Sequence, residues 1–449
     1  MRYLRNLWHK FFTPINISYL FINIGNIPIM TIVSSFLAIY YVNVLKMDEY
    51  AVGTMFLIAR IFDGINDPLI GGIIDRIKGD KLQKFKRVLI LGTIICSINY
   101  MILWLGPALV SENFKLLIAY ISYLLLGVTF PIMDISLNSL LPVLAKQKEE
   151  REILSSIKII GYGLGTVIIE FFVPLFLSRF GHTIKTYWGI VILSTLFIIV
   201  FSVGGAIGIK NDKNVFQVKV NEKKNQQNII GSFLKIFFEK NVLCTFFSGL
   251  CFYTGNAALV IANTYYTTYY LGDVKYLTYV TIATYSLEMF VILLIPVLTK
   301  KIETRIIFSS GLVMAGMGLL IRFYPWKTFD SILCSLLISS AIYGIGYGFV
   351  MILFYSIQAE NVDRVYIQYD IQAESSIAAI MSMVNKLGKG IGGALPLYIL
   401  GKMKVNDTTY SKYSLRLIAS FVPALLFLVG GILFMILYDK DLRQKVVKK

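Results

Sequence analysis

Long apolar stretches recur along this chain of 449 residues and restrict its fold more than any other feature. Each is about 20 residues or longer, the helix length needed to cross the ~30 Å hydrocarbon layer of a bilayer. Charged residues make up 15% of the sequence, against about 25% in a typical soluble domain. None of the stretches shows the alternating pattern of a membrane β-barrel. The sequence therefore predicts an all-α polytopic membrane protein.

Twelve of these stretches are predicted to be transmembrane helices. Their approximate limits are 15–44, 51–75, 87–108, 116–144, 154–178, 187–208, 231–270, 277–299, 305–324, 331–358, 375–400 and 415–438. A polar segment, 209–229, separates six spans from the other six. We therefore expect an N-terminal six-helix bundle (1–208), a cytoplasmic linker and a C-terminal six-helix bundle (230–449) around a central cavity. Lys and Arg are more frequent in the termini, the linker and every second loop, which predicts an inner-membrane protein with both termini in the cytoplasm.

The second span carries an unusual cluster of polar and charged residues. Arg60, Asp63 and Asp67 are spaced i, i+3, i+7 and share one helix face, with Asn66 beside them. An ionised group in hydrocarbon costs at least ~2.5–3.5 kcal/mol, so such a cluster needs compensation. Two carboxylates and an amide oxygen are hard ligands that suit Na⁺, Li⁺ or H⁺. The alternative is a structural ion-pair network, in which one arginine would have to neutralise two acids.

Other spans carry isolated ionisable residues. In the fourth span, Pro131 is expected to kink or open the helix and to expose a carbonyl near Asp134. Lys158 in the fifth span either faces a cavity or extends to the cytoplasmic surface. Glu170 and Glu288 are candidate proton carriers, with burial as neutral carboxyl groups as the alternative.

Residues near the cytoplasmic ends of the spans are candidates for a gate, since ion pairs there can hold one conformation and break in another. A purely topological role for the basic residues is the alternative. The gate candidates are Arg60, Asp75, Arg76, Glu360, Asp363 and Glu374. Lys386, deep in the eleventh span, is expected to bind substrate or to pair with an acid of the facing bundle.

Several function classes are excluded by what the sequence lacks. The four cysteines and two histidines are scattered, so no metal centre or nucleophile–base pair can be assembled, and we expect neither an enzyme nor a cofactor. The net charge of +17 lies between the apolar spans, which argues against nucleic-acid binding. A sensor or scaffold would carry soluble domains, and the longest polar segment has only about 20 residues. The expected partners are a small-molecule substrate and the lipid bilayer, and the protein is expected to be a monomer.

Four sequence segments resemble a known family. The second-span segment reads RIFDGINDPLIGGIIDR and is followed by KFKR, and the fourth span contains GVTFPIMDISLNSLLP. EREILSSIK opens the fifth span, and VNKLGKG lies in the eleventh. These segments resemble the signatures of the glycoside–pentoside–hexuronide:cation symporters, the melibiose permease-like branch of the major facilitator superfamily. The resemblance implies the major facilitator fold and cation-coupled symport of a small solute, sugar or glycoside-like, across the cytoplasmic membrane.

The resemblance also implies roles for individual residues. It implies cation binding by Asp63, Asn66 and Asp67, and substrate binding by Asp134, Lys158 and Lys386.

The chain departs from the family pattern at five positions. Ile27 stands where sugar-transporting members have an acid, and Asn26 replaces a lysine. Pro131 replaces a cation-site threonine of the melibiose branch. Asn138 and Met351 replace tryptophans expected beside the sugar, so they remain candidate substrate contacts of a different kind. The loss of an acid and of two aromatic residues argues against a galactoside as the substrate, so cation coupling is better supported than sugar transport.

The departures leave a second hypothesis open. The same fold would then act as a proton-coupled exporter of a peptide, a lipid-like product or another non-sugar molecule, with Asp134 and Glu288 as the proton carriers.

Overall fold

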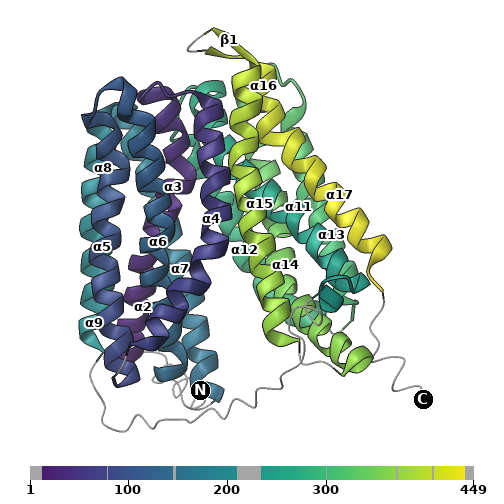
Figure 1. The fold of residues 1–449 in the computed structure, drawn as a ribbon. Helices are drawn as coiled ribbons and strands as arrows, with labels where there is room; N and C mark the ends of the chain where they lie inside the picture. The colour runs from purple at the N-terminus through teal and green to yellow at the C-terminus, as the bar shows by residue number, and fades with distance from the viewer. Residues whose placement is uncertain are drawn as a thin grey trace, which may run out of the picture. The chain divides into compact units, whose positions relative to one another are not determined.

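The computed structural model describes residues 13–77, 79–144, 148–209, 234–299, 301–370, 373–406 and 409–439. The chain divides into two compact units, Met1–Val220 (unit 1) and Asn221–Lys449 (unit 2). Long helices dominate both units and, within each unit, run side by side (Figure 1). The dividing point falls inside the predicted linker 209–229, of which residues 210–229 lie outside the described ranges.

Unit 1 consists of helices joined by short connections. They are α2 (Pro14–Asn26), α3 (Pro28–Ile39), the π-helical turn η1 (Tyr40–Val44), α4 (Glu49–Arg76), α5 (Lys81–Leu109), α6 (Glu112–Leu144), α7 (Lys148–Phe180), α8 (Ile184–Ile198), the π-helical turn η2 (Ile199–Val203) and α9 (Gly204–Gly208).

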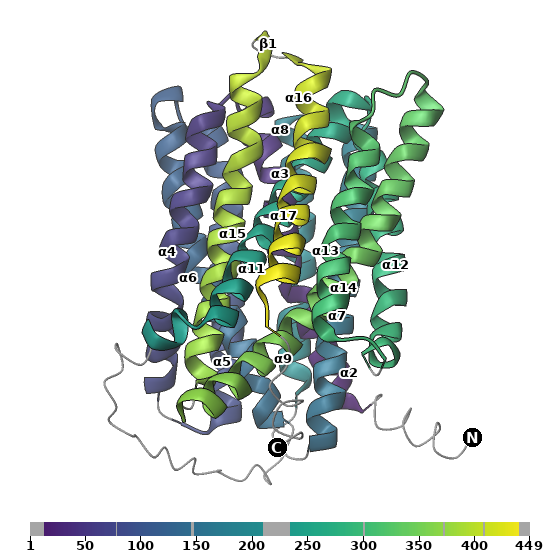
Figure 2. The same ribbon diagram turned by 90° about the vertical axis from the view of Figure 1, so that its right-hand side faces the viewer.

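Unit 2 has helices and one short hairpin of two antiparallel strands. In Figure 2, α12, α13 and α14 lie next to one another. The elements are α11 (Lys240–Tyr265), η3 (Tyr266–Tyr270), α12 (Tyr276–Leu298), α13 (Thr304–Leu320), η4 (Ile321–Phe323), α14 (Phe329–Tyr369), α15 (Glu374–Lys402), β1 (Lys404–Asn406), β2 (Thr409–Tyr410), α16 (Lys412–Arg416), η5 (Leu417–Phe421) and α17 (Val422–Leu437).

Within the described ranges, nine helical segments are long and apolar enough to cross a membrane. They are Pro14–Val44, Lys81–Leu109, Glu112–Leu141, Ile153–Phe180, Ile184–Gly208, Lys240–Tyr270, Thr304–Phe323, Phe329–Tyr369 and Lys412–Leu437. Helices α4, α12 and α15 lie at the other three predicted spans, and the described residues of these helices alone do not meet that criterion. The prediction of an all-helical membrane protein is confirmed, with the small β1–β2 hairpin as an addition that the sequence did not indicate.

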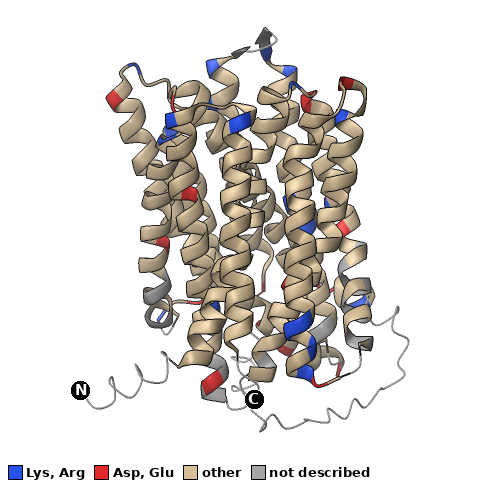
Figure 3. Ribbon diagram, turned by 90° about the vertical axis from the view of Figure 1, so that its left-hand side faces the viewer, with Lys and Arg blue, Asp and Glu red and all other residues tan. Residues whose placement is uncertain are grey.

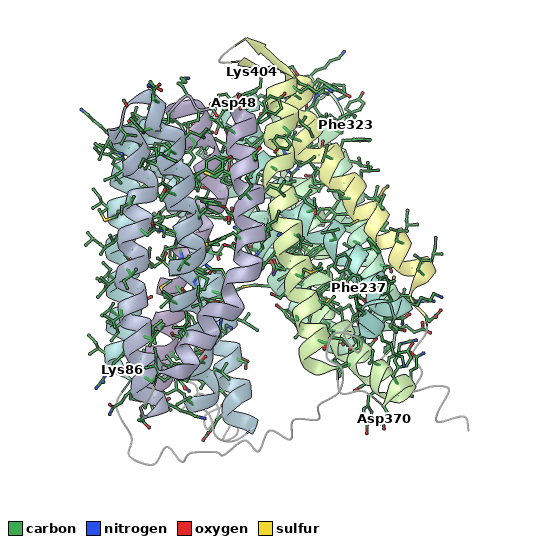
Figure 4. The ribbon with its side chains drawn as sticks, viewed as in Figure 1. Asp48, Lys86, Phe237, Phe323, Asp370 and Lys404 are labelled. Atoms are coloured by element: carbon green, nitrogen blue, oxygen red, sulfur yellow. The ribbon has the colours of Figure 1, made fainter. Side chains whose placement is uncertain are left out.

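Polar side chains mark the ends of the helices, and Figure 3 shows Lys, Arg, Asp and Glu gathered mainly there. Asp48 caps α4 by accepting a hydrogen bond from the Ala51 amide at 2.8 Å. At the opposite end of unit 1, the Lys86 ammonium donates to the Ile209 carbonyl at 2.8 Å. Figure 4 labels Asp48 and Lys86 at these two ends. These contacts satisfy backbone groups that helix ends leave without an intrahelical partner.

Helix α14 is longer than the sequence predicted. The predicted span ended at residue 358, but the helix continues to Tyr369 and carries Glu360 and Asp363 on its last turns. These two residues therefore lie on a helix, where the sequence had predicted the edge of a loop. Helical hydrogen bonding does not require an apolar sequence, so hydropathy marks the membrane boundary and not the end of the helix.

Helices α2 and α7 pack closely enough to share the candidate site. A Cβ atom at Gly165 would collide with the Ile27 side chain and would lie 2.8 Å from the Ile24 carbonyl oxygen. Only glycine permits this approach, as is common where membrane helices pack tightly. The close contact brings the end of α2 next to the α7 residues that follow Lys158.

Candidate functional site

The carboxylate of Asp134 is the centre of a hydrogen-bonded cluster inside unit 1. Its Oδ1 accepts from Asn26 Nδ2 at 2.8 Å and from the Tyr162 hydroxyl at 3.1 Å. Its Oδ2 accepts from Asn138 Nδ2 at 2.9 Å. The donors come from α2, α6 and α7, so three helices converge on one acid. Three donors to one carboxylate hold the three helices together at this point, since hydrogen bonds to charged groups are worth ~1.5–3 kcal/mol each.

Lys158 joins the cluster through Asn138. Its ammonium donates to Asn138 Oδ1 at 2.5 Å and lies 5.4 Å from the centroid of the Tyr162 ring. Asn138 therefore accepts from the base with its oxygen and donates to Asp134 with its nitrogen. Lys158 thus contacts residues inside unit 1, and its predicted role in substrate binding stays a prediction. The cluster carries one negative and one positive charge.

The local sequence explains why these side chains meet. Asp134 and Asn138 are four residues apart on α6, and Lys158 and Tyr162 are four residues apart on α7, so each pair shares a helix face. Asn26 is the last residue of α2, immediately before the interruption at Ile27 and Pro28. Because α2 and α7 are pressed together at Gly165, Asn26 and Tyr162 reach the same carboxylate oxygen.

Buried oxygen atoms near this cluster have no hydrogen-bond partner in the described structure. Asn26 and Asn23 are both fully buried, and the Oδ1 atom of each is unsatisfied. Residues 23 and 26 lie on one face of α2. An unsatisfied buried polar group costs ~1–3 kcal/mol, so these acceptors favour a ligand or water that brings hydrogen-bond donors.

A second polar cluster joins α4 to α6. Asp63 Oδ2 forms an ion pair with Arg60 Nη1 at 3.0 Å, and both side chains are about 15% exposed. Tyr123 of α6 also interacts with Arg60. Beside this pair, Asn66 Nδ2 donates to the Gly127 carbonyl at 3.1 Å.

The Gly127 carbonyl is available because of Pro131. Proline has no N–H, so the carbonyl four residues earlier, that of Gly127, lacks its α-helical partner. Helix α6 continues without interruption from Glu112 to Leu144, so the expected opening of the helix at Pro131 is not observed. The expected freed carbonyl is instead used by Asn66. Gly127 also makes room for Asp63, whose Oδ1 occupies the space that a Cβ would need.

Four of the predicted site residues have side chains outside the described part of the structure. They are Asp67, Asp75, Arg76 and Glu374. The backbones of the first three continue α4, and the last begins α15. The predicted pairing of Asp63 with Asp67 thus stays a prediction.

Three further candidates lie in unit 2. Met351 on α14 packs against the apolar core of that unit. Lys386 is half-buried on α15. Glu288 on α12 has a buried Oε2 without a hydrogen-bond partner in the described structure. In unit 1, the remaining candidate carrier, Glu170, accepts from the Ser35 hydroxyl at 3.4 Å.

Glu360 contacts the segment that follows α17. The Tyr438 hydroxyl donates to Glu360 Oε2 and can also donate to Asn361 Oδ1, both at 3.3 Å. Arg305 Nη1 donates to the Tyr438 carbonyl at 3.0 Å. These contacts tie α14 to the residue that follows α17.

The sequence matches the family described as MFS/sugar transport protein over residues 18–440. The chain belongs to this family. A glucuronide carrier protein homolog of Escherichia coli is 25% identical over 82% of this chain and 78% of its own length. The isoprimeverose transporter of Lactiplantibacillus pentosus is 24% identical over 82% of this chain and 76% of its own length. The resemblance to glycoside–pentoside–hexuronide:cation symporters is confirmed, and so are the predictions of a membrane transporter and of a protein that is not an enzyme.

Solved structures give the same fold. A point mutant of the nucleoside transporter NupG superimposes with a TM-score of 0.68 at 15% identity, covering 95% of this chain and 100% of that one. At this identity the match shows that the two chains share a fold, and it says nothing about the substrate.

The sequence did not predict two of the hydrogen-bond donors in the Asp134 cluster, Asn26 and Tyr162. Asn26 stood out in the sequence only because it replaces a lysine of the family pattern, and Tyr162 did not stand out at all. The spacing of Tyr162 one turn after Lys158 was a usable signal. The pairing of Asn26 with Asp134 joins residues 108 positions apart and had no local signal.

Proposed function

We propose that this MFS transporter is a cation-coupled importer of uncharged, hydroxylated solutes of the sugar and glycoside class. The observation that supports this most directly is the Asp134 cluster, in which an acid and a base are joined by an amide. Its charges balance, so an uncharged solute enters without leaving a net charge in the site. A hydroxyl group can accept from Lys158 and donate to Asp134, as the amide of Asn138 now does.

We further propose the arrangement that the sequence predicted. Twelve spans form two six-helix bundles, and substrate binds between them near mid-membrane, with Met351 and Lys386 contributing from unit 2. The protein acts as a monomer in the cytoplasmic membrane with both termini in the cytoplasm. Rocking of the bundles exposes the site to each side in turn, while Arg60, Asp75, Arg76, Glu360, Asp363 and Glu374 serve the gate.

The cation is proposed to bind beside Asp63 and Asn66, with Asp67 as a further ligand. Carboxylate, amide and carbonyl oxygens are present together at the contact of α4 with α6, and such hard ligands suit Na⁺ or Li⁺. A proton is the alternative coupling ion, with Glu170 and Glu288 as possible carriers. The relatives named above are sugar and glycoside carriers, which does not favour the alternative of a proton-coupled exporter of peptides or lipid-like products.

Uptake into proteoliposomes tests the proposed function. Purified protein is given labelled neutral glycosides, acidic sugars and dipeptides under an imposed gradient of Na⁺, Li⁺ or H⁺. We expect accumulation of at least one neutral glycoside, driven by one of these gradients and abolished when that gradient is collapsed. Gradient-driven movement of dipeptides alone, or accumulation independent of all three gradients, would refute the proposal.

Pro131→Ala tests whether the contact between Asn66 and the Gly127 carbonyl supports the cation site. Alanine supplies the missing N–H, which competes with Asn66 for the carbonyl. One hydrogen bond is worth ~1 kcal/mol, so we expect an about fivefold higher cation concentration for half-maximal uptake and for half-maximal thermal stabilisation by cation. The matched control is Pro174→Ala, the same change inside α7. Equal effects of the two substitutions would show that only general helix stability had changed.

A further inference from the structure

An apolar groove runs along the surface of unit 1 between α7 and α8. Its volume is ≈500 Å³, and none of the residues of the Asp134 cluster line it. The groove is open at the surface of the molecule, since Phe172 is 62% exposed and Leu193 is 58% exposed. Among the described lining residues, only Arg179 carries a charge.

The α7 wall of the groove is a stripe on one helix face. Ile168, Phe172, Leu175 and Arg179 are spaced i, i+4, i+7, i+11, so their side chains follow each other along the helix. The stripe is apolar for three positions and ends with a cation one residue before the end of α7. On α8, residues 190, 193 and 197 form the facing wall at i, i+3, i+7.

Arg179 has no acidic partner in the part of the chain that the structure describes. Its guanidinium lies 5.9 Å from the centroid of the Phe180 ring, which is the interaction that the structure assigns to it. The side chain is exposed, at the end of a helix that crosses the membrane. A cation in this position lies at the level of the lipid headgroups.

The dimensions of the groove fit one acyl chain. From Ile168 to Arg179 the helix rises ~16 Å at 1.5 Å per residue, close to half of the ~30 Å hydrocarbon layer. A single acyl chain can therefore lie along the apolar stripe, with its headgroup at the level of Arg179.

We propose that this groove binds a phospholipid with an anionic headgroup. One acyl chain lies between α7 and α8, and the headgroup phosphate contacts Arg179. The proposal does not depend on the identity of the transported solute or of the coupling ion. Helix α7 also carries Lys158 and Tyr162, so a lipid held along it stabilises the helix that supplies two members of the Asp134 cluster.

Native mass spectrometry of the full-length protein tests the proposal. The detergent-purified protein is titrated with phosphatidylglycerol and with phosphatidylcholine of the same acyl chains. One surface cation contributes ~1 kcal/mol to anionic lipid binding, so Arg179→Ala is expected to weaken phosphatidylglycerol binding about fivefold. Binding of phosphatidylcholine, whose choline cation offsets the charge of its phosphate, is expected to be weakened less. Leu193→Trp fills the groove and is expected to weaken binding of both lipids.

Lys185→Ala is the matched control, because Lys185 is an exposed cation near the same end of unit 1 and does not line the groove. Each variant is first compared with the unsubstituted protein by thermal unfolding without added lipid, and equal unfolding temperatures show that the fold is intact. Equal loss with Lys185→Ala and Arg179→Ala would overturn the proposal, as would unchanged lipid binding by Leu193→Trp. A dimer in the same spectra that Leu193→Trp dissociates would show that a second copy of the chain occupies this face instead.

Discussion

Asp63→Cys is expected to abolish uphill accumulation of the solute while leaving downhill exchange measurable. A symporter that moves one charge across 100 mV gains ~2.3 kcal/mol, which supports an about 50-fold concentration ratio. Without the Asp63 carboxylate the proposed cation site loses its described acidic ligand, and that ratio should fall to about 1. The measurement is the steady-state ratio of labelled solute in proteoliposomes with an imposed cation gradient and membrane potential.

A second variant separates cation binding from a structural ion pair. Asp63→Cys leaves Arg60 mostly buried without its partner, and breaking a buried pair in this way destabilises a protein by ~3–5 kcal/mol. The double variant Arg60→Ala, Asp63→Cys removes the unpaired charge and is expected to recover thermal stability but not accumulation. If the double variant accumulates solute like the unsubstituted protein, Asp63 acts only as the partner of Arg60.

Asp134→Asn is expected to weaken solute binding about 100-fold. The substituted amide presents an N–H₂ group toward donors from Asn26, Tyr162 or Asn138, and Lys158 loses the negative charge that balances it. Loss of about 3 kcal/mol, roughly two charge-assisted hydrogen bonds at the low end of their range, corresponds to two orders of magnitude. Binding is measured by the thermal shift that a transported glycoside induces in purified protein.

Asp48→Asn is the matched control for this substitution. Asp48 is an N-cap outside both clusters, and asparagine caps helices about as well as aspartate. Asp134→Asn and Asp63→Cys should also differ in which ligand still stabilises the protein. Asp134→Asn should keep the stabilisation by cation, while Asp63→Cys should keep a shift with solute. Normal glycoside binding by Asp134→Asn would remove the main support for the proposed substrate site.

The sequence predicted the helical membrane fold and the polar character of both clusters. Charged residues in apolar spans are conspicuous because lipid penalises them, so Asp63, Asp134 and Lys158 could be identified without a structure. Their grouping into pairs on one helix face follows from helix periodicity, as with Asp134 and Asn138. Contacts between helices are different, because they depend on packing that no local pattern encodes.

Asn26 and the Gly127 carbonyl illustrate what the sequence could not predict. Asn26 meets Asp134 only because α2 approaches α7 and α6, and an uncharged amide does not stand out in a sequence. Pro131 did predict a freed carbonyl, but not that α6 would stay continuous or that Asn66 would use that carbonyl. Similarly, hydropathy predicted that the tenth span ends near residue 358. In the structure the helix continues, and Glu360 lies on it and contacts Tyr438.

The missing side chain at Gly165 has a consequence for how this transporter can change its cargo during evolution. Any larger residue there would push α2 away and withdraw the Asn26 amide from the acid that it shares with Tyr162. In a saturation library selected for growth on new solutes, variants with any residue other than glycine at position 165 should be lost first. Adaptive substitutions should collect instead at 138, whose side chain contacts both Asp134 and Lys158.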